Sequence, residues 1–421
     1  MAKNTFACDS HFCSGRNSNS DIYFIENEGK KAMKNLLSKR LPKDLSPSPF
    51  FKKLEELKKV DSFLDLTVSS PLKVGICPDL KSAVACSEKE WDTWNPEAAG
   101  WDSAREAVVN YYQNRGGVFS ANQILLTSST SEAYSILFKT FCNPGDVILT
   151  PVPGYPLLDT LAMLEQLSCY PYFLKQSKEN NFVIDTDSLL SAPENATILL
   201  LISPHNPTGH CVSKKEWQEI IAFCKERNLI LVVDEVFGDY IFNSNIKRSF
   251  LFENSDVPVF WLNGLSKTVG SPEVKLGWIA YKAPCKKIII EIQEALEYVA
   301  DAYLSVSSMA QALSIPLLQD SLDYEGRVML RLHENLDFLS KEFPPEICPQ
   351  ISGGWYAALH FDLDDEQFTL DLLEKERVLV QPGFFFDFEE DGWIVVSLLQ
   401  APELFQEGIK KIKRALGTFN Y

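Results

Sequence analysis

The sequence predicts an α/β protein built around a largely parallel β-sheet. From Cys86 onward, helix-like and strand-like segments alternate, with turn residues between them. Several of the strand-like segments, such as Leu229–Val233, are continuous apolar runs, as expected for strands buried inside a sheet. The chain has 421 residues, 45% of them hydrophobic and 12% aromatic, so it can build one large or two medium cores.

In chain order, the elements predict an N-terminal extension followed by two domains. Residues 1–40 are polar and predict a poorly ordered extension with a short helical piece near Lys30–Lys39. The capping box Ser213-x-x-Glu216 marks the start of one helix. The other predicted elements are helices at Phe50–Val60, Cys285–Leu304, Tyr324–Phe343 and Pro402–Leu416, and strands at Ser62–Thr67, Gln123–Thr127, Val147–Thr150, Leu229–Asp234 and Val257–Leu262, with a further strand from Ile198 that ends at Asn206. We expect 41–85 to form the N-terminal part of a small α+β domain, 86–305 a large domain and 306–421 the rest of the small domain.

Charge, apolar runs and cysteines restrict where the protein acts. A net charge of −17 argues against binding to nucleic acid or an anionic membrane, because phosphate groups would repel the chain. No apolar run approaches the roughly 20 residues of a membrane span, and the N-terminus lacks a continuous apolar signal core. The cysteines are scattered without a paired framework, which favours reduced thiols in the cytoplasm. Cys8, His11 and Cys13 form the only candidate metal cluster, and because it lacks a second half we expect no metal.

Three polar residues follow three successive apolar strands. Asn206 ends the run from Ile198, Asp234 ends the next run, and Lys267 comes just after Val257–Leu262. Because the carboxyl ends of parallel strands meet at one edge of a sheet, we expect the three side chains to converge on one crevice. A lysine, a carboxylate and an amide match the needs of a pyridoxal 5′-phosphate (PLP) site. There the lysine forms an aldimine, the acid pairs with the protonated ring nitrogen and the amide binds the ring hydroxyl.

Short motifs along the chain, in this order and spacing, resemble those of the class I/II aminotransferases of PLP fold type I, the aspartate aminotransferase superfamily. The resemblance runs from about Leu41 to the C-terminus. The motifs are Gly100-x4-Arg105, Leu126–Ala133, Asn143-Pro-Gly-Asp146, Pro151–Pro156, Asn206-Pro-Thr-Gly209, Asp234-Glu, Leu265–Thr268 and Gly277-Trp278. The resemblance implies a large PLP-binding domain at 86–305, a mostly parallel central sheet flanked by helices, and a homodimer with each active site at the interface.

The resemblance also assigns roles to individual residues. Lys267 and Asp234 are the expected catalytic residues. Tyr155 is expected to stack on the pyridine ring, and Trp94 stands where the family often has a tyrosine that reaches the partner subunit's phosphate. The residues expected to bind the cofactor are Ser129, Thr130, Ser131, Tyr155, Asn206, Asp234, Ser266, Lys267, Lys275 and Trp94. Ser129, Thr130 and Ser131 open a helix, whose N-terminal N–H groups and hydroxyls suit a phosphate, although this loop lacks the glycine usual in the family.

The chain departs from the family pattern at four places. One is Ser70-Pro71, where related sequences carry a more polar substrate loop, and the other three replace residues that bind cofactor or substrate. Phe237 replaces a tyrosine that binds the ring oxygen, which should raise the pKa of the internal aldimine. Lys275 replaces an arginine that binds the phosphate. A lysine keeps the positive charge but cannot form the bidentate hydrogen bonds of the arginine. Val395 replaces an arginine that binds the substrate α-carboxylate, so either another cation substitutes or the substrate lacks that carboxylate in its usual place.

Candidate substrate-binding residues follow from these departures. Lys73, Gly75 and Arg105 are the positions we consider for the substrate carboxylate. The aromatic stretch Gly383–Phe388 predicts small-domain core, with an apolar substrate pocket as the alternative. His205 next to Asn206 predicts a structural histidine, with contact to substrate or cofactor as the alternative.

The predicted function is that of a PLP-dependent aminotransferase. It would move an amino group from an amino acid or amine donor to a 2-oxo acid by a ping-pong mechanism through the Lys267 aldimine. Two alternatives remain open. A PLP-dependent lyase or decarboxylase of the same fold would use the same lysine but break a different bond, and a non-catalytic cofactor-binding paralogue would keep only the fold.

Overall fold

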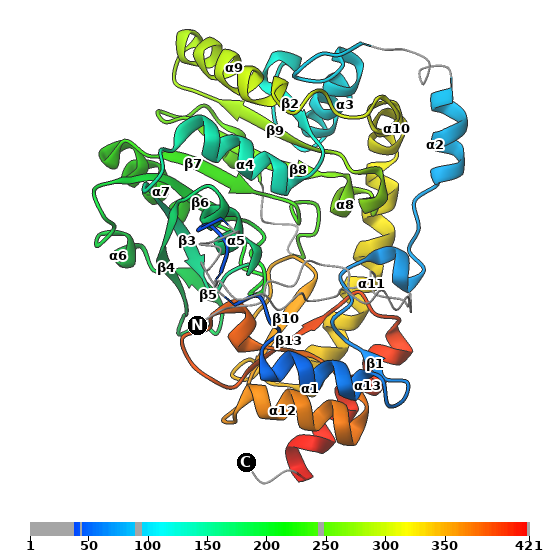
Figure 1. Ribbon diagram of the computed structural model, residues 1–421. Helices are drawn as coiled ribbons and strands as arrows, with labels where there is room; N and C mark the ends of the chain where they lie inside the picture. Colours follow the sequence, from blue (N-terminus) through cyan, green and yellow to red (C-terminus); the bar gives the residue numbers. More distant parts are fainter. Residues whose placement is uncertain (1–37, 43, 89–94, 243–247, 419–421) are drawn as a thin grey trace, which may run out of the picture.

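The computed structural model describes residues 38–42, 44–88, 95–242 and 248–418, and its largest feature is an eight-stranded sheet (Figure 1). The strand order is β2-β9-β8-β7-β6-β3-β4-β5. The neighbours β4, β3, β6, β7 and β8 pair in parallel, whereas β9 and β5 run antiparallel to their neighbours. The strands are β2 (Ile124–Thr127), β3 (Val147–Val152), β4 (Ser168–Gln176), β5 (Phe182–Ile184), β6 (Ala196–Ile202), β7 (Ile230–Asp234), β8 (Val259–Gly264) and β9 (Gly277–Lys282). The predicted α/β class with a mostly parallel sheet is confirmed.

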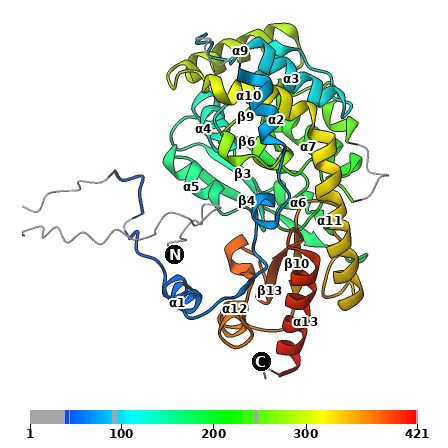
Figure 2. The same ribbon diagram turned by 90° about the vertical axis from the view of Figure 1, so that its right-hand side faces the viewer.

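Helices cover both faces of this sheet (Figure 2). Successive residues of a strand point to opposite faces, and in β6 Leu199 packs in a core with Trp217 while Leu200 packs in a second core with Leu137. The first core takes in helices α3 (Asp102–Gln113), α6 (Thr186–Leu189) and α7 (Lys214–Arg227). The second takes in α4 (Thr130–Phe141), α5 (Leu157–Leu164) and α9 (Lys286–Asp301). Burial on both faces explains why the inner strands are continuous apolar runs.

A second, smaller group of strands lies below the large sheet in Figure 1. An antiparallel sheet has the order β10 (Tyr356–His360), β13 (Trp393–Ser397), β12 (Gln381–Pro382), and β1 (Leu64–Asp65) pairs in parallel with β11 (Val378–Leu379). The helices of this region are α1 (Pro49–Lys58), α12 (Asp365–Asp371) and α13 (Pro402–Thr418). The long helix α11 (Ser321–Glu342) runs from the large sheet to the small one (Figure 1). The division into 41–85, 86–305 and 306–421 stays a prediction, and the β1–β11 pair joins its first and third segments.

The remaining helices are short or connect the two groups of strands. They are α2 (Leu80–Ser87), α8 (Leu265–Thr268) and α10 (Ser308–Gln319), with single turns at Pro71–Val74, Ala121–Gln123, Ser249–Phe252, Pro272–Val274, Leu372–Glu376 and Gly383–Phe386. Within the described ranges, no helix combines the length and the apolar character needed to cross a membrane.

Most of the predicted elements are present, and the differences have local causes. The capping box of α7 forms both of its hydrogen bonds, between Ser213 and Glu216. Helix α10 was not predicted, because Pro316 lies inside it and proline has no N–H to continue the helical ladder. Strand β6 ends at Ile202, four residues earlier than predicted from the run toward Asn206. The predicted helical piece near Lys30–Lys39 falls almost entirely outside the described residues.

The unpredicted helix α10 is tied to the start of α3 by one buried side chain, Gln311. Its Oε1 accepts from the backbone N of Trp101 at 2.6 Å, and its Nε2 donates to the carbonyl of Val306 at 2.7 Å. Gln311→Met keeps the volume but removes both bonds and leaves a buried N–H unpaired, so we expect it to lower the free energy of unfolding by about 1–3 kcal/mol in urea denaturation. The matched control is Gln319→Met on the exposed end of the same helix, with an expected change within about 0.5 kcal/mol. Equal curves for the two variants would contradict this role of Gln311.

Candidate active site

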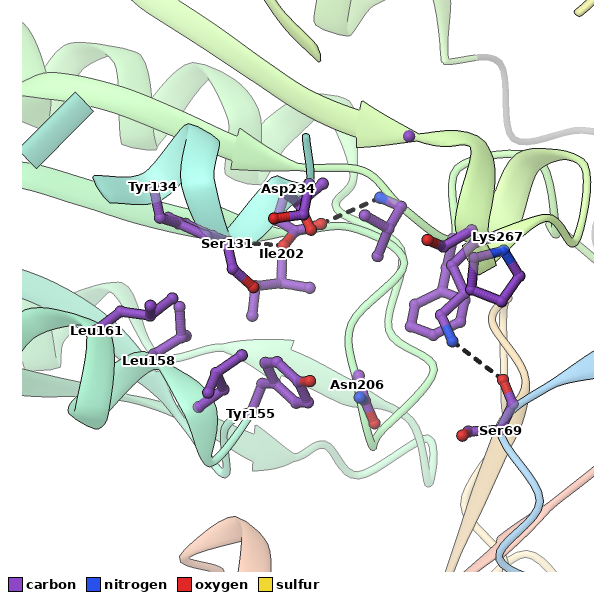
Figure 3. A pocket seen from close by; sticks show the side chains of 18 of the residues that line it. Ser69, Ser131, Tyr134, Tyr155, Leu158, Leu161, Ile202, Asn206, Asp234 and Lys267 are labelled. Carbon is purple, nitrogen blue, oxygen red and sulfur yellow. Dashed lines mark hydrogen bonds between the residues drawn. The ribbon is translucent and has the colours of Figure 1, made fainter. Parts of the chain in front are cut away.

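One pocket lies at the carboxyl edge of β6, β7 and β8, and it contains the three polar residues predicted to converge (Figure 3). Asn206, Asp234 and Lys267 all line it. The strand register explains this, since Ile202 of β6 is paired with Asp234 of β7, and Asp234 with Leu262 of β8. The pocket is lined by Ser69, Ser70, Ser128, Ser129, Thr130, Ser131, Tyr134, Tyr155, Leu157, Leu158, Leu161, Ile202, Asn206, Asp234, Val236, Phe237, Gly264, Ser266, Lys267, Pro272, Lys275, Leu276 and Tyr356.

Asp234 presents a buried carboxylate that two hydrogen bonds hold in place. Tyr134 Oη donates to Oδ2 at 2.6 Å, and the backbone N of Val236 donates to Oδ1 at 3.1 Å. Burial raises the pKa of Asp234 above its ordinary value, against the lowering effect of these two bonds. A cation placed against the carboxylate would offset this cost of burial. Asp234 is therefore suited to a positively charged partner such as a protonated ring nitrogen.

Tyr134, the residue that orients Asp234, is not among the residues predicted from the sequence. It lies in α4, four residues after Thr130. Residues four apart share one face of a helix, so the helix that begins in the serine-rich loop brings Tyr134 to the same pocket. That spacing is the signal from which Tyr134 could have been found.

Lys267 lies in the single-turn helix α8 directly after β8, with its side chain turned into the pocket (Figure 3). Its Nζ donates to the carbonyl of Ser69 at 3.0 Å. The same Nζ lies 5.0 Å from the ring centroid of Trp355 and 5.9 Å from that of Phe237, within the range of cation–π attraction. Tyr240 Oη donates to the Lys267 carbonyl at 2.6 Å and fixes the backbone of the turn.

The loop before α4 has the features of an anion site at the other end of the pocket. Ser129 caps α4 by accepting from the backbone N of Glu132 at 3.1 Å, and its φ of −173° is extended backbone that needs no glycine. Thr130 and Ser131 follow at the helix N-terminus, where unpaired N–H groups and the helix dipole favour a phosphate. A Cβ on Gly277 would lie 2.9 Å from the carbonyl carbon of Ser129, so only glycine allows β9 to pack this closely against the loop.

Ser266, Lys275, Tyr155 and Asn206 complete the set of predicted residues in the pocket. Ser266 and Lys275 line it from α8 and from the turn before β9, and the Tyr155 ring points into it from the loop after β3 (Figure 3). The Oδ1 atom of Asn206 is buried and has no hydrogen-bond partner among the described residues. A ring hydroxyl could donate to this atom.

These groups fit PLP. The observations that support the fit are the orphaned Asn206 oxygen, the buried Asp234 carboxylate, the helix N-terminus with its serines and threonine, and a lysine with its amino group inside the pocket. The donor set offers a separate partner for the ring nitrogen, the ring oxygen, the phosphate and the aldehyde.

The structure does not bring the predicted carboxylate-binding residues into the pocket. Arg105 is buried against the loop before β2, where it donates to the carbonyls of Gly100 and Ala121 and pairs with Asp102. Lys73 and Gly75 are exposed just beyond the pocket-lining Ser69 and Ser70. Trp94 lies outside the described residues.

The aromatic stretch and the histidine have structural contacts. Phe384 and Phe385 pack against Phe50 of α1 and do not line the pocket, but Phe384 is exposed and Phe385 half-buried, so only Phe386 of the three belongs to the buried core. His205 is buried beside Thr208, with Nδ1 2.9 Å from the threonine Oγ1, and burial together with His210 lowers its pKa to about 3. It does not line the pocket, so it is the structural histidine that was predicted.

Comparisons with known proteins agree with this geometry. A family described as aminotransferase class I and II matches residues 80–412. Among curated proteins, the chain is 26% identical over 337 residues to glutamate-pyruvate aminotransferase AlaA of Haemophilus influenzae, which covers 77% of this chain and 82% of the relative. It is 24% identical over 363 residues to tyrosine aminotransferase of Caenorhabditis elegans, covering 83% of this chain and 77% of the relative.

Solved structures share the fold. The structure of alanine aminotransferase from Pyrococcus furiosus has a TM-score of 0.79 at 24% identity and covers 88% of this chain and 96% of its own. That of aspartate aminotransferase from Thermotoga maritima has a TM-score of 0.76 at 18% identity and covers 90% of this chain and 100% of its own. Because the family match spans most of the chain and includes the pocket around Lys267, the protein belongs to the class I and II aminotransferases, a family of PLP-dependent transferases.

Proposed function

We propose that the protein moves an amino group from an amino donor to a 2-oxo acid by a ping-pong mechanism centred on Lys267. The observation that supports this most strongly is the convergence of Lys267, Asp234 and Asn206 on one pocket. Asp234 ends β7, and the other two lie in the segments that follow β8 and β6. When bound, PLP supplies an electron sink and carries the amino group from donor to acceptor.

Each of the three residues has a distinct task in this proposal. Lys267 Nζ takes the proton from the substrate carbon that bears the amino group and returns it later in the cycle. The Ser69 carbonyl and the Trp355 and Phe237 rings keep the amino group inside the pocket. The Asp234 carboxylate stabilises a proton on the ring nitrogen, with Tyr134 holding the carboxylate in position.

The phosphate and the ring plane are held by the rest of the pocket. Ser129, Thr130 and Ser131 at the start of α4, with Ser266 and Lys275, bind the phosphate, and Tyr155 stacks on the ring. Asn206 binds the ring oxygen, where Phe237 offers no hydroxyl to help it.

We propose that the protein acts as a homodimer in the cytoplasm. The family resemblance supports a dimer, with each active site at the interface. The cysteines in the described part of the chain are all free, which supports a reducing compartment.

Lys267→Ala should abolish borohydride-stable attachment of PLP. It should also slow the half-reaction with an amino donor by at least about 10³-fold, since both the attachment point and the proton carrier are lost. Borohydride fixation followed by mass spectrometry, and stopped-flow spectra of the half-reaction, measure the two effects. Lys275→Ala is the matched control, because it should weaken PLP binding while keeping the adduct on Lys267. A fixed adduct that persists in Lys267→Ala would overturn the assignment.

Tyr134→Phe removes the hydrogen bond to Asp234 Oδ2 and should weaken PLP binding about tenfold, because bonds to a buried carboxylate are among the stronger ones. PLP titration followed by absorbance measures the dissociation constant. Tyr172→Phe is the matched control, since this equally buried tyrosine donates to the Leu200 carbonyl at 2.9 Å away from the pocket. Tyr172→Phe should lower stability without changing PLP affinity. If both variants change PLP affinity equally, Tyr134 has no positioning role.

Phe237→Tyr adds a hydroxyl that can donate to the ring oxygen of the cofactor. Such a donor stabilises the deprotonated form, so the pH midpoint of the visible absorption change should fall by about one unit relative to the wild type. A spectral pH titration of the two holoenzymes measures the shift. An unchanged or higher midpoint would show that this position does not contact the ring oxygen.

A further inference from the structure

We propose that the pocket recognises its amino donor through apolar surface and not through an α-carboxylate. Primary amines with an aromatic or branched apolar substituent should then serve as donors at least as well as the amino acids that carry the same side chain. The inference rests on the proposed function and concerns the end of the pocket beside Lys267.

The first argument is the distribution of charge in the pocket. Among the described residues that line it, Lys267 and Lys275 are the only cations. The family resemblance assigns Lys275 to the cofactor phosphate, and Gly277, two residues later, packs against Ser129 of the phosphate loop. Lys267 is the proton carrier. The described lining therefore leaves no cation to pair with a carboxylate on the substrate.

The arginines buried near the large sheet are already paired elsewhere. Arg115 lies between Asp239 and Glu325, with N–O distances of 2.6 and 2.9 Å. Arg248 pairs with Glu235. Arg105 binds backbone carbonyls before β2. None of the three lines the pocket, and moving any of them there would leave a buried acid or carbonyl without its partner.

The second argument comes from the register of the small sheet. Directly opposed residues of an antiparallel pair point to the same face, so Tyr356 shares a face with Ser397 in one row. The next row on that face is Ala358, Val395 and Gln381. Tyr356 lines the pocket, so this is the face turned toward it.

That second row offers no charge to a substrate. Val395 is fully buried, and Gln381 provides only a neutral amide, whose Oε1 is buried and has no hydrogen-bond partner among the described residues. A carboxylate brought to this face would lose its water without gaining a cation, which is costly. A neutral group at the same place avoids that cost.

The surroundings of Lys267 favour an apolar substituent. Phe237 and Tyr356 line the pocket with ring centroids 6.0 Å apart, and Trp355 packs against Phe237 at 5.3 Å. Rings in this arrangement give a large apolar surface onto which an aromatic or branched aliphatic group can pack.

The exchange balances without any additional oxidant. An amine RCH₂NH₂ and a 2-oxo acid R′COCOO⁻ become an aldehyde RCHO and an amino acid R′CH(NH₂)COO⁻. The amine carbon loses two electrons and the keto carbon gains them. The amino group moves from the donor to the acceptor. Water supplies the oxygen of the aldehyde in the first half-reaction, and the carbonyl oxygen of the 2-oxo acid leaves as water in the second. The carboxylate of the 2-oxo acid meets the same lack of a cation in the described lining, so we expect the acceptor to bind weakly.

A binding experiment tests the recognition without turnover. The probes are 3-phenylpropanoate and its neutral counterpart 3-phenylpropanamide, titrated calorimetrically into the wild-type holoenzyme. We expect the amide to bind at least as tightly as the acid. Tighter binding of the acid by tenfold or more, about the effect of one good charged hydrogen bond, would overturn the inference.

Val395→Arg adds a cation to the row beside Tyr356 and should move the ratio of the two dissociation constants by about 100-fold in favour of the acid. Val395→Met, of similar length but uncharged, is the matched control and should leave the ratio within about threefold. A charge-independent shift, equal in both variants, would overturn the proposal that charge at this face decides recognition. If neither variant folds, the wild-type ratio alone decides the matter.

Half-reaction rates separate this inference from the proposed function. The matched donors are 2-phenylethylamine with phenylalanine and 3-methylbutylamine with leucine, each mixed with the PLP holoenzyme. Amine rate constants equal to or above those of the amino acids support the inference. Amino acids favoured more than tenfold in both pairs overturn it and leave transamination intact. No conversion of either pair, and none of the corresponding aldehydes and 2-oxo acids with the pyridoxamine-loaded enzyme, would overturn the proposed function itself.

Discussion

The parallel register of β6, β7 and β8 is the constraint on which the site depends. It sets Ile202, Asp234 and Leu262 side by side, so the segments that follow these strands all leave the sheet at one edge. Asn206 and Lys267 reach the pocket from those segments, while Asp234 is the last residue of its own strand. A slip of one residue in β7 would turn Asp234 to the other face of the sheet and away from Tyr134.

Helix α4 connects this edge to the rest of the pocket. Its first residues form the proposed phosphate site, and one turn later Tyr134 binds Asp234. The same helix packs on the sheet through Ile136 and Leu137, which belong to the apolar core it shares with α5 and α9. The distance between the phosphate end and the acid is therefore set by helix geometry and held by core packing rather than by a loop.

The fold and the centre of the site could be predicted because they depend on local patterns. Apolar runs located β6, β7 and β8, and polar residues after those runs located Asn206, Asp234 and Lys267. Contacts between segments far apart in sequence could not be predicted. The hydrogen bond from Lys267 to Ser69 joins residues 198 positions apart, and the hydrophobic periodicity of the sequence carries no information about such a contact. Arg105 was considered for the substrate carboxylate, but in the folded chain it donates to the carbonyls of Gly100 and Ala121. These tertiary contacts could not be predicted from the sequence. Helix α10 could not be predicted because Pro316 lowers the local helix propensity of this segment. Packing against α2 and α3 stabilises the helix nonetheless.

The bond between Lys267 and Ser69 has a consequence for how the chain matures on the ribosome. Ser69 follows Leu66, whose carbonyl accepts a hydrogen bond from the backbone N of Ser397 at 2.7 Å, and β1 pairs with β11. The large sheet is complete once Lys282 has been synthesised, well before these C-terminal strands emerge. A nascent chain can therefore assemble the sheet that carries Asp234 and Lys267 before the Ser69 carbonyl is held in place to accept the hydrogen bond from Lys267. The segment that carries Ser69 is fixed beside the lysine amino group only after β13 has been translated.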